Sequence, residues 1–277
     1  MSFALDHIVI NVLFDMDGAA ALMSQLGFTL TPRGYHSLGS INHLMMFEGQ
    51  YLELVGLPPG VLRKDILESP RGLNGLVFRV DDIDACLVKL RRSGLAMLEP
   101  QSFSRPVIID GVEHLARFRT VRTAPELFEA GRVYYCQHYT PELVWHRPWM
   151  SHPNGCHGLS ELVVVSAAIE TDVAHYAKAA QANAQRLGEE AWTIELTDSF
   201  RISLISPTLY RERYGACCVE TDGRRSFFGA IVFNAPDLAR IRDLASSIPD
   251  LRVETGESSL TLLIPFLNSL LEFRGDR

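Results

Sequence analysis

The same order of predicted elements, a strand, a helix and then further strands, recurs four times along this chain of 277 residues. Apolar segments that begin near residues 5 and 73 open the first two units, 68 residues apart. A larger offset of 154 residues relates His7 to Glu161 in one pair of opening strands and Gly75 to Gly229 in the other. Two strand matches at one offset indicate that a half made of two units was itself duplicated. This pattern restricts the chain to folds built from similar repeated modules.

Local signals mark the strands and the helix of each unit. The helix expected over residues 16–26 ends at Gly27, which suits a left-handed cap, and the helix over 83–92 follows Asp81-Asp82, which offers a cap. Expected strands in the first half cover residues 5–12, 28–31, 41–47, 51–55, 76–80, 106–110, 114–120 and 132–138. The second half has expected helices over 172–187 and 236–248, with strands over 159–165, 191–197, 200–205, 228–233, 251–255, 259–264 and 270–273.

A connector separates the two halves. Between Trp145 and Gly158 the periodic pattern stops, and two prolines and an Asn-Gly turn signal take its place. Domain boundaries fall in such segments. We therefore predict an N-terminal domain over residues 1–147 and a C-terminal domain over residues 156–277.

Composition excludes several classes of protein. The chain is 47% hydrophobic and 21% charged, which is typical of a soluble globular protein with two ordinary domains. It has no apolar run long enough for a membrane span and no secretory signal, so the expected location is the cytoplasm, away from membranes. A net charge of -7 with scattered Lys and Arg argues against nucleic acid as a partner. Five cysteines without paired spacing favour neither a disulfide scaffold nor a zinc ribbon. A small-molecule substrate is the expected partner.

Two polar residues stand out in apolar strands of the first unit. His7 lies near the start of the strand LDHIVINV, and Glu53 lies in the strand expected over residues 51–55. A histidine in such a strand can be a core residue that bonds a neighbour, or it can serve a site. A carboxylate in an apolar strand costs free energy unless a metal ion or a charged side chain lies beside it. Both readings remain open from the residues alone.

Four segments of the first unit resemble one known superfamily. LDHIVINV, GFTL, GSINHL and YLELVG, covering residues 1–57, are similar to the glyoxalase-like branch of the vicinal oxygen chelate (VOC) superfamily. The stretch YCQHYTPELVW over residues 135–145 is similar to one found in bacterial glyoxalase-like proteins. The resemblance implies an α+β fold in which four βαβββ modules form two half-barrel domains, as in glyoxalase, bleomycin-resistance and extradiol-dioxygenase proteins. The superfamily holds both enzymes and ligand-binding members, so it fixes architecture better than reaction.

The resemblance also implies a metal site inside the first half. The family's ligand positions fall on His7, on Glu53 and near Gln137-His138, where His138 is the better ligand, while the fourth position falls at Gly75 or Asn74, neither of them a good ligand. Two imidazoles and a carboxylate suit a divalent metal, namely Fe, Mn, Zn or Ni, and leave coordination positions for substrate. The missing ligand departs from the four-ligand glyoxalase pattern and leaves a three-ligand, dioxygenase-type site open. Glu161 and Glu272 occupy related places in the second half, where we expect remnants or core carboxylates and so a degenerate site.

Other polar side chains are candidates for the same cavity. We expect His43 or Glu142 to serve as the base that moves a proton. Substrate-binding candidates are His36, Asn42, Arg119 and Tyr135, and turn, solvent-facing or core roles are the alternatives for them.

Two functional classes follow. The first is a metal-dependent enzyme, a lyase or isomerase or an extradiol-type dioxygenase, which acts on a small substrate with adjacent oxygen atoms. The second is a metal-free protein of the same fold that binds a small molecule. The half-barrels can pair within one chain, which gives a monomer, or between two chains, which gives a homodimer. The sequence is compatible with both.

Overall fold

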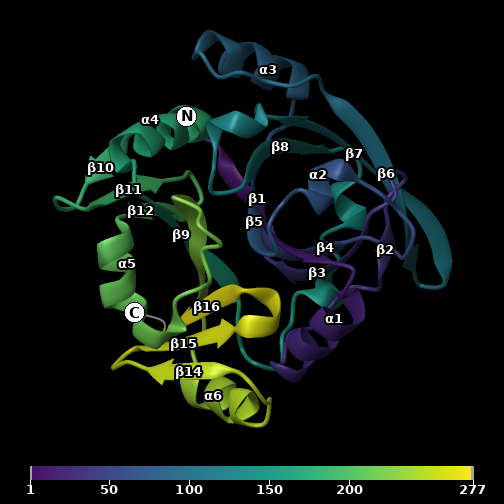
Figure 1. The fold of residues 1–277 in the computed structure, drawn as a ribbon. Coiled ribbons are helices and arrows are strands. Elements are labelled where there is room, and N and C mark those ends of the chain that lie inside the picture. Colours follow the sequence, from purple (N-terminus) through teal and green to yellow (C-terminus); the bar gives the residue numbers. More distant parts are fainter. Residues whose placement is uncertain (1, 276–277) are drawn as a thin grey trace.

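The computed structural model describes residues 2–275 and shows an α+β fold with two eight-stranded sheets (Figure 1). The first module contains β1 (Ala4–Leu13), α1 (Met16–Gln25), β2 (Gly34–Tyr35), β3 (Ile41–Phe47) and β4 (Gln50–Gly56), followed by the short helix α2 (Lys64–Leu67). The second contains β5 (Gly72–Arg79), α3 (Ile83–Arg92), β6 (Gln101–Ile109), β7 (Val112–Arg122) and β8 (Arg132–His138). These two modules form one sheet.

The other two modules repeat this order in the second sheet. The third contains β9 (Gly158–Ser166), α4 (Ile169–Ala180), β10 (Ala184–Arg186), β11 (Ala191–Glu195) and β12 (Arg201–Ile205), followed by α5 (Pro207–Tyr214). The fourth contains β13 (Ser226–Asn234), α6 (Leu238–Ser246), β14 (Arg252–Thr255), β15 (Ser259–Ile264) and β16 (Ser269–Arg274). The predicted arrangement of four βαβββ modules in two half-barrels is thus confirmed.

The first sheet curves until its two edges meet. Its strand order is β2-β3-β4-β1-β5-β8-β7-β6, with β1 antiparallel to β5 at the centre and β4 and β8 parallel to them on either side. Beyond the edge strand β2, the backbone N–H of Ser37 donates to the carbonyl of Ser104 in β6 at 2.8 Å. The interior of the first sheet is therefore enclosed by strands on nearly all sides, which creates a sheltered cavity.

A helix of its own chain fills the second sheet. The side chains of Tyr210 and Tyr214, on α5, are buried against apolar residues of β9, β13 and β16. The hydroxyl of Tyr210 donates to the carbonyl of Gly229 at 2.9 Å. The interior of the second half is thus occupied by protein, whereas that of the first half is open to a ligand.

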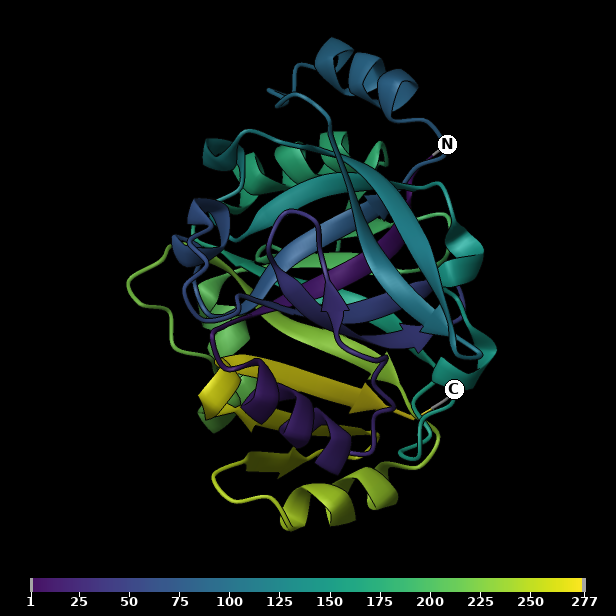
Figure 2. The same cartoon turned by 90° about the vertical axis from the view of Figure 1, so that its right-hand side faces the viewer.

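The outer faces of the two sheets share one continuous core. Phe28, after α1, packs on Phe233 of β13 with ring centroids 5.3 Å apart. Tyr135 of β8 donates its hydroxyl proton to the carbonyl of Ala179, in α4 of the other half, at 2.9 Å. Figure 2 shows α1 lying beside the C-terminal strands of the second half, and Gly18 of α1 lies close to the ring of Phe266. The halves therefore stabilise each other.

Most expected elements agree with the structure, but several differ, and the helix α5 and the strand β10 were not expected at all. Residues 28–31 form no strand, and β2 lies instead at Gly34–Tyr35. The helix expected over residues 172–187 ends at Ala180, because Gln181 adopts a left-handed conformation with φ of 52°. In the connector, His152 is buried and donates to the carbonyl of Met46 at 2.9 Å, so it packs on the first half. No helix within residues 2–275 is both long and apolar enough to cross a membrane.

Candidate functional site in the first half-barrel

A β-bulge in β1 places Asp6 and His7 together. The pairing of β1 with β5 shifts between Leu5 and His7, so Asp6 has no partner across the ladder. Neighbouring residues of a regular strand point to opposite faces, and a bulge removes that alternation. The Nδ1 of His7 lies 2.5 Å from Oδ1 of Asp6 and donates its proton there. This contact fixes the imidazole ring and turns Nε2 toward the cavity.

Glu53 of β4 faces that nitrogen. Its Oε2 lies 3.4 Å from Nε2 of His7, and both residues are buried. Although burial opposes the charged form, hydrogen bonding and attraction from His7 lower the pKa of Glu53 to about 2. For His7, burial lowers the pKa, but the two carboxylates outweigh this and raise it above its ordinary value. An imidazolium between two carboxylates is thus the favoured state.

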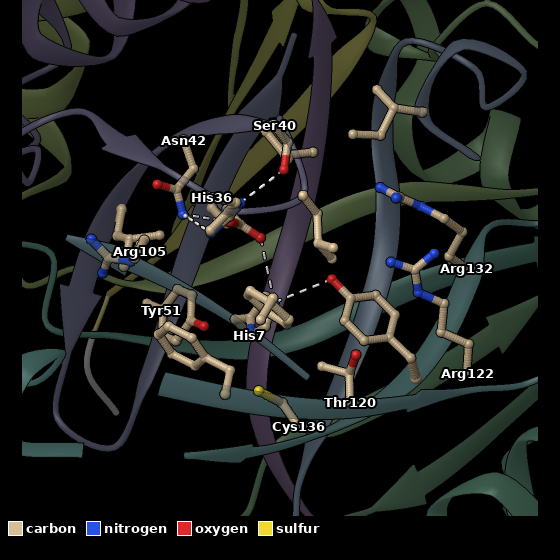
Figure 3. A pocket seen from close by; sticks show the side chains of 18 of the residues that line it. His7, His36, Ser40, Asn42, Tyr51, Arg105, Thr120, Arg122, Arg132 and Cys136 are labelled. Atoms are coloured by element: carbon tan, nitrogen blue, oxygen red, sulfur yellow. Dashed lines mark hydrogen bonds and ion pairs between the residues drawn. The ribbon is translucent and has the colours of Figure 1, made fainter. Parts of the chain in front are cut away.

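A chain of hydrogen bonds leads from Glu53 across the cavity wall. Asn42 donates from Nδ2 to Oε1 of Glu53 at 2.7 Å and lies 3.3 Å from Nε2 of His36. His36 contacts the hydroxyl of Ser40 at 2.8 Å, and Arg63 donates to the same hydroxyl at 3.0 Å. Burial lowers the pKa of His36 to about 4, so this ring is neutral near pH 7. Figure 3 shows this row of polar side chains.

Aromatic and apolar groups complete the cavity. The ring of Tyr51 stacks on His7 with centroids 4.3 Å apart, and the hydroxyl of Tyr134 lies 3.3 Å from Nε2 of His7. Phe103 and Phe118 stack on each other at 5.1 Å and belong to the same lining. The space inside the cavity is about 70 Å³, which has room for a small molecule of a few non-hydrogen atoms. Four arginines also line it, namely Arg63, Arg105, Arg122 and Arg132.

The structure brings some of the predicted site residues together. His7, Glu53, His36 and Asn42 all line this cavity. His138 lies apart from the His7 and Glu53 contact, and its Nε2 bonds Oδ2 of Asp6 at 2.9 Å. Within residues 2–275, the one group of three or more possible ligand atoms within 4.8 Å of one another is Asp6, Cys136 and His138.

Four other predicted residues lie outside the cavity lining, which corrects their expected placement. Tyr135 belongs to the shared core on the opposite face of β8, because side chains alternate along a strand. Arg119 forms a two-bonded surface pair with Asp84.

His43 and Glu142 also face away from the cavity. His43 lies on β3 next to Asn42, on the other face of the strand, where it bonds the carbonyl of Thr31 at 2.8 Å. Glu142 is exposed in a short 3-10 helix over Pro141–Leu143.

Sequence reasoning missed several residues of the site. Asp6 escaped notice because a regular strand would turn it away from His7, and no local signal marked the bulge. Tyr135 was the expected cavity residue, but its neighbour Tyr134 is the one that lines the cavity, because successive side chains of a strand point to opposite faces. The four cavity arginines lie on separate elements, and no local signal in the sequence grouped them.

The matching region of the second half holds no open site of this kind. Glu161 is bonded by Arg274 at 2.8 Å, and Glu272 is bonded by Arg213 at 2.9 Å and by the hydroxyl of Tyr214 at 2.7 Å. Both carboxylates are therefore neutralised by side chains of their own chain.

A family model described as a glyoxalase-like domain matches residues 5–188. The chain belongs to this glyoxalase-like family. That places it in the VOC superfamily, as the segments of its first unit suggested. The matched region includes the whole candidate site. No functionally curated protein matches the sequence significantly.

Solved structures share the fold of this glyoxalase-like protein. A hypothetical protein from Staphylococcus aureus is 12% identical with a TM-score of 0.69, over 98% of this chain and 99% of that one. A mutant of 4-hydroxymandelate synthase from Streptomyces coelicolor is 15% identical with a TM-score of 0.56, over 100% of this chain and 94% of that one. A xylose isomerase-like TIM barrel/4-hydroxyphenylpyruvate dioxygenase fusion protein is 13% identical with a TM-score of 0.58, and the match covers 100% of this chain and 50% of that one. At these identities the likeness concerns architecture.

Proposed function

We propose that this glyoxalase-like protein is an enzyme of the isomerase or lyase type, which moves a proton on a small substrate with adjacent oxygen atoms. The observation that carries the proposal is the opposed pair of His7 Nε2 and Glu53 Oε2, 3.4 Å apart inside a sheltered cavity. Two proteins with the same fold are named as enzymes, a synthase and a dioxygenase fusion protein, which is consistent with an enzyme on this fold.

The two side chains have complementary states for this reaction. His7, held as an imidazolium by Asp6, can donate a proton or hydrogen bond to a substrate oxygen where negative charge develops. Glu53 can accept a proton from the carbon next to the carbonyl group that holds this oxygen, so that the electron pair of the broken C–H bond moves onto the oxygen. Their contact is longer than the usual 2.7–3.2 Å hydrogen-bond range, so an incoming oxygen can replace it. Separating the pair would raise the pKa of Glu53 and make it a stronger base, because His7 lowers that pKa in the free protein.

The divalent metal predicted from the family fits this cavity only in part. Asp6 orients His7 as a carboxylate commonly orients a metal-binding histidine. The 3.4 Å between Nε2 of His7 and Oε2 of Glu53 is also short enough for both atoms to bind one ion. Catalytic metal ions usually have three protein ligands, and His138 instead bonds Asp6. Arg105 and Arg132, which line the cavity without a carboxylate partner among the described residues, also oppose a divalent cation. We therefore derive no step through a metal, and metal analysis of the protein purified without a histidine tag tests this directly.

Deuterium exchange measured by proton NMR tests the proton transfer. Hydroxyacetone, pyruvate and 2-oxoglutarate are incubated with the protein in D2O, and loss of signal from the carbon beside the carbonyl is followed. We expect enzyme-dependent exchange for at least one of them, reduced by about 100-fold or more in His7→Gln and Glu53→Gln. The control variant is His114→Gln, because His114 is an exposed residue on β7. This variant should exchange the substrate's protons at the wild-type rate. Equal exchange in all variants would contradict the proposal.

A ligand-binding protein without catalysis is the alternative. In that case the same compounds would bind, as calorimetry can show, yet no variant would affect exchange because none would occur. Stoichiometric Fe, Mn, Zn or Ni, lost in His7→Gln, would instead support the metal-dependent enzyme predicted from the sequence.

A further inference from the structure

We infer that the substrate carries two separate anionic groups, one bound by Arg105 and the other by Arg132. This inference deepens the proposed function, on which it rests, by naming the chemical class of the substrate. It comes from the charges that line the cavity and from which of them have partners.

Two of the four cavity arginines are already neutralised. Asp65, beside the cavity, accepts from Nη2 of Arg63 at 2.5 Å and from Nη1 of Arg122 at 2.8 Å. Arg63 also donates to Ser40, and the Arg122 guanidinium lies 5.9 Å from the centroid of the Tyr134 ring. One carboxylate shared by two guanidinium groups holds this part of the wall in place and leaves both groups less available to a ligand.

Arg105 of β6 has no such partner. The residue is 3% exposed, and its Nη2 has no hydrogen-bond partner among the described residues. Its side chain packs over Gly34, where a Cβ would lie 3.1 Å from Cδ of Arg105. Burial lowers the pKa of Arg105, with Tyr51 and Glu53 opposing that effect. A buried guanidinium without a bonded carboxylate costs stability, so we assign it a ligand anion as its partner.

Arg132, at the start of β8, is in a similar state. Its Nε donates to the neutral Oδ1 of Asn74 at 2.8 Å, while its buried Nη2 has no hydrogen-bond partner within residues 2–275. Burial lowers the pKa of this guanidinium too. Neither Arg105 nor Arg132 forms an ion pair with a carboxylate in the described part of the chain.

The two guanidinium groups that have no carboxylate partner lie on opposite sides of His7 in the view of Figure 3. In Figure 3, Arg105 is on one side of His7, and Arg132 is on the other side together with Arg122. A substrate with an anionic group at each end would therefore place its middle atoms beside His7. Guanidinium groups bind carboxylates and phosphates through paired hydrogen bonds, which gives the substrate a fixed direction.

Isothermal titration calorimetry with short probe anions tests this inference. Malonate and succinate carry two separated carboxylates, butyrate carries one, and 1,4-butanediol is a neutral analogue of succinate. We expect malonate or succinate to bind at least about tenfold more tightly than butyrate, and the diol to give no heat. Arg105→Met and Arg132→Met should each weaken the dicarboxylate by at least about tenfold, to the level of butyrate. Arg119→Met, which removes a surface arginine, is the matched control and should bind like the wild type.

Several results would overturn the inference. Equal affinity for butyrate and succinate would show that a second anionic group is not recognised. Inorganic phosphate that binds as tightly as the dicarboxylates and depends on one arginine alone would indicate a single anion site. Circular dichroism and thermal unfolding of each variant must match the wild type, and Arg105→Lys and Arg132→Lys, which keep the charge, replace any methionine variant that unfolds.

The outcome is separate from that of the proposed function. If succinate requires both arginines while His7→Gln leaves its affinity unchanged and no exchange occurs, the dianion site stands and catalysis fails. In the opposite case, exchange of neutral hydroxyacetone requires His7 but is unaffected in both arginine variants, and the dicarboxylates bind no better than butyrate. Catalysis then stands and the dianion site fails.

Discussion

Asp6 and His7 are neighbours in one strand, yet their side chains meet, with Oδ1 of Asp6 2.5 Å from Nδ1 of His7. The bulge in β1 makes this possible, and the same carboxylate also bonds His138 through its second oxygen at 2.9 Å. Burial raises the pKa of Asp6, but attraction to His138 and the hydrogen bonds from both imidazole rings outweigh this and lower it. Asp6 is therefore a positioning residue that holds two imidazoles.

Replacing this carboxylate should affect both stability and the site. We expect Asp6→Asn to lower the free energy of unfolding by about 1–3 kcal/mol, since the amide can accept from only one of the two rings. It should also shift the pH profile of exchange, because His7 loses the charge that raises its pKa. Denaturant unfolding and exchange against pH measure both effects, and Asp84→Asn on the surface is the control. An unchanged pH profile would mean that Asp6 is purely structural.

The charge pair of His7 and Glu53 predicts a pH-dependent stability. The pKa of Glu53 is lowered to about 2, so its contribution is full above its ordinary value of 4.5 and is lost as the pH falls toward 2. The pKa of His7 is raised above 6.5, so its contribution is full below 6.5 and is lost as the pH rises through the raised value.

Thermal unfolding of Glu53→Gln across this range gives the measurement. The variant should be less stable than the wild type near pH 6, by an amount on the order of 3 kcal/mol at most. The difference should shrink as the pH falls from 4.5 toward 2, because the Glu53 carboxylate of the unfolded chain becomes protonated below its ordinary pKa of 4.5, whereas that of the folded wild type stays ionised down to about 2. A difference that stays constant down to pH 2 would rule out the charged pair as its cause.

Gly34 provides room for the polar row of the cavity. A Cβ at this position would lie 2.2 Å from Oδ1 of Asn42, which already bonds Glu53 through its amide. We expect Gly34→Ala to cost about 1–3 kcal/mol and to weaken succinate binding, because Asn42 and Arg105 must both move. Gly188→Ala is the matched control, since nothing lies within 4 Å of a Cβ there. Chemical denaturation and calorimetry compare the two variants, and equal losses would contradict this account.

The tyrosines at 134 and 135 should separate stability from function. Tyr135→Phe removes the hydrogen bond to Ala179 in the other half and should cost about 1 kcal/mol or more, with ligand affinity preserved. Tyr134→Phe removes the hydroxyl that faces His7 and should change the exchange rate with little loss of stability. The reverse pattern in unfolding and exchange experiments would place Tyr135 in the site, as expected among the substrate-binding candidates of the sequence.

The sequence by itself determined the modules. The periods of apolar residues, the cap at Asp82 and the stop at Gly27 are local signals, and α3 over Ile83–Arg92 and β8 over Arg132–His138 have the expected bounds. His7 and Glu53 also emerged from the sequence, because a polar group in an apolar strand is conspicuous wherever the strand ends up.

The tertiary structure alone decided which side chains share the cavity. One unpaired residue in β1 turned Asp6 toward His7, and one step of alternation in β8 chose Tyr134 over Tyr135. Closure of the sheet then brought Arg105 of β6 against Gly34 of β2, and Arg132 enters the same cavity from β8. Such choices depend on how strands register and close with distant partners, and the composition of any single segment does not contain that information.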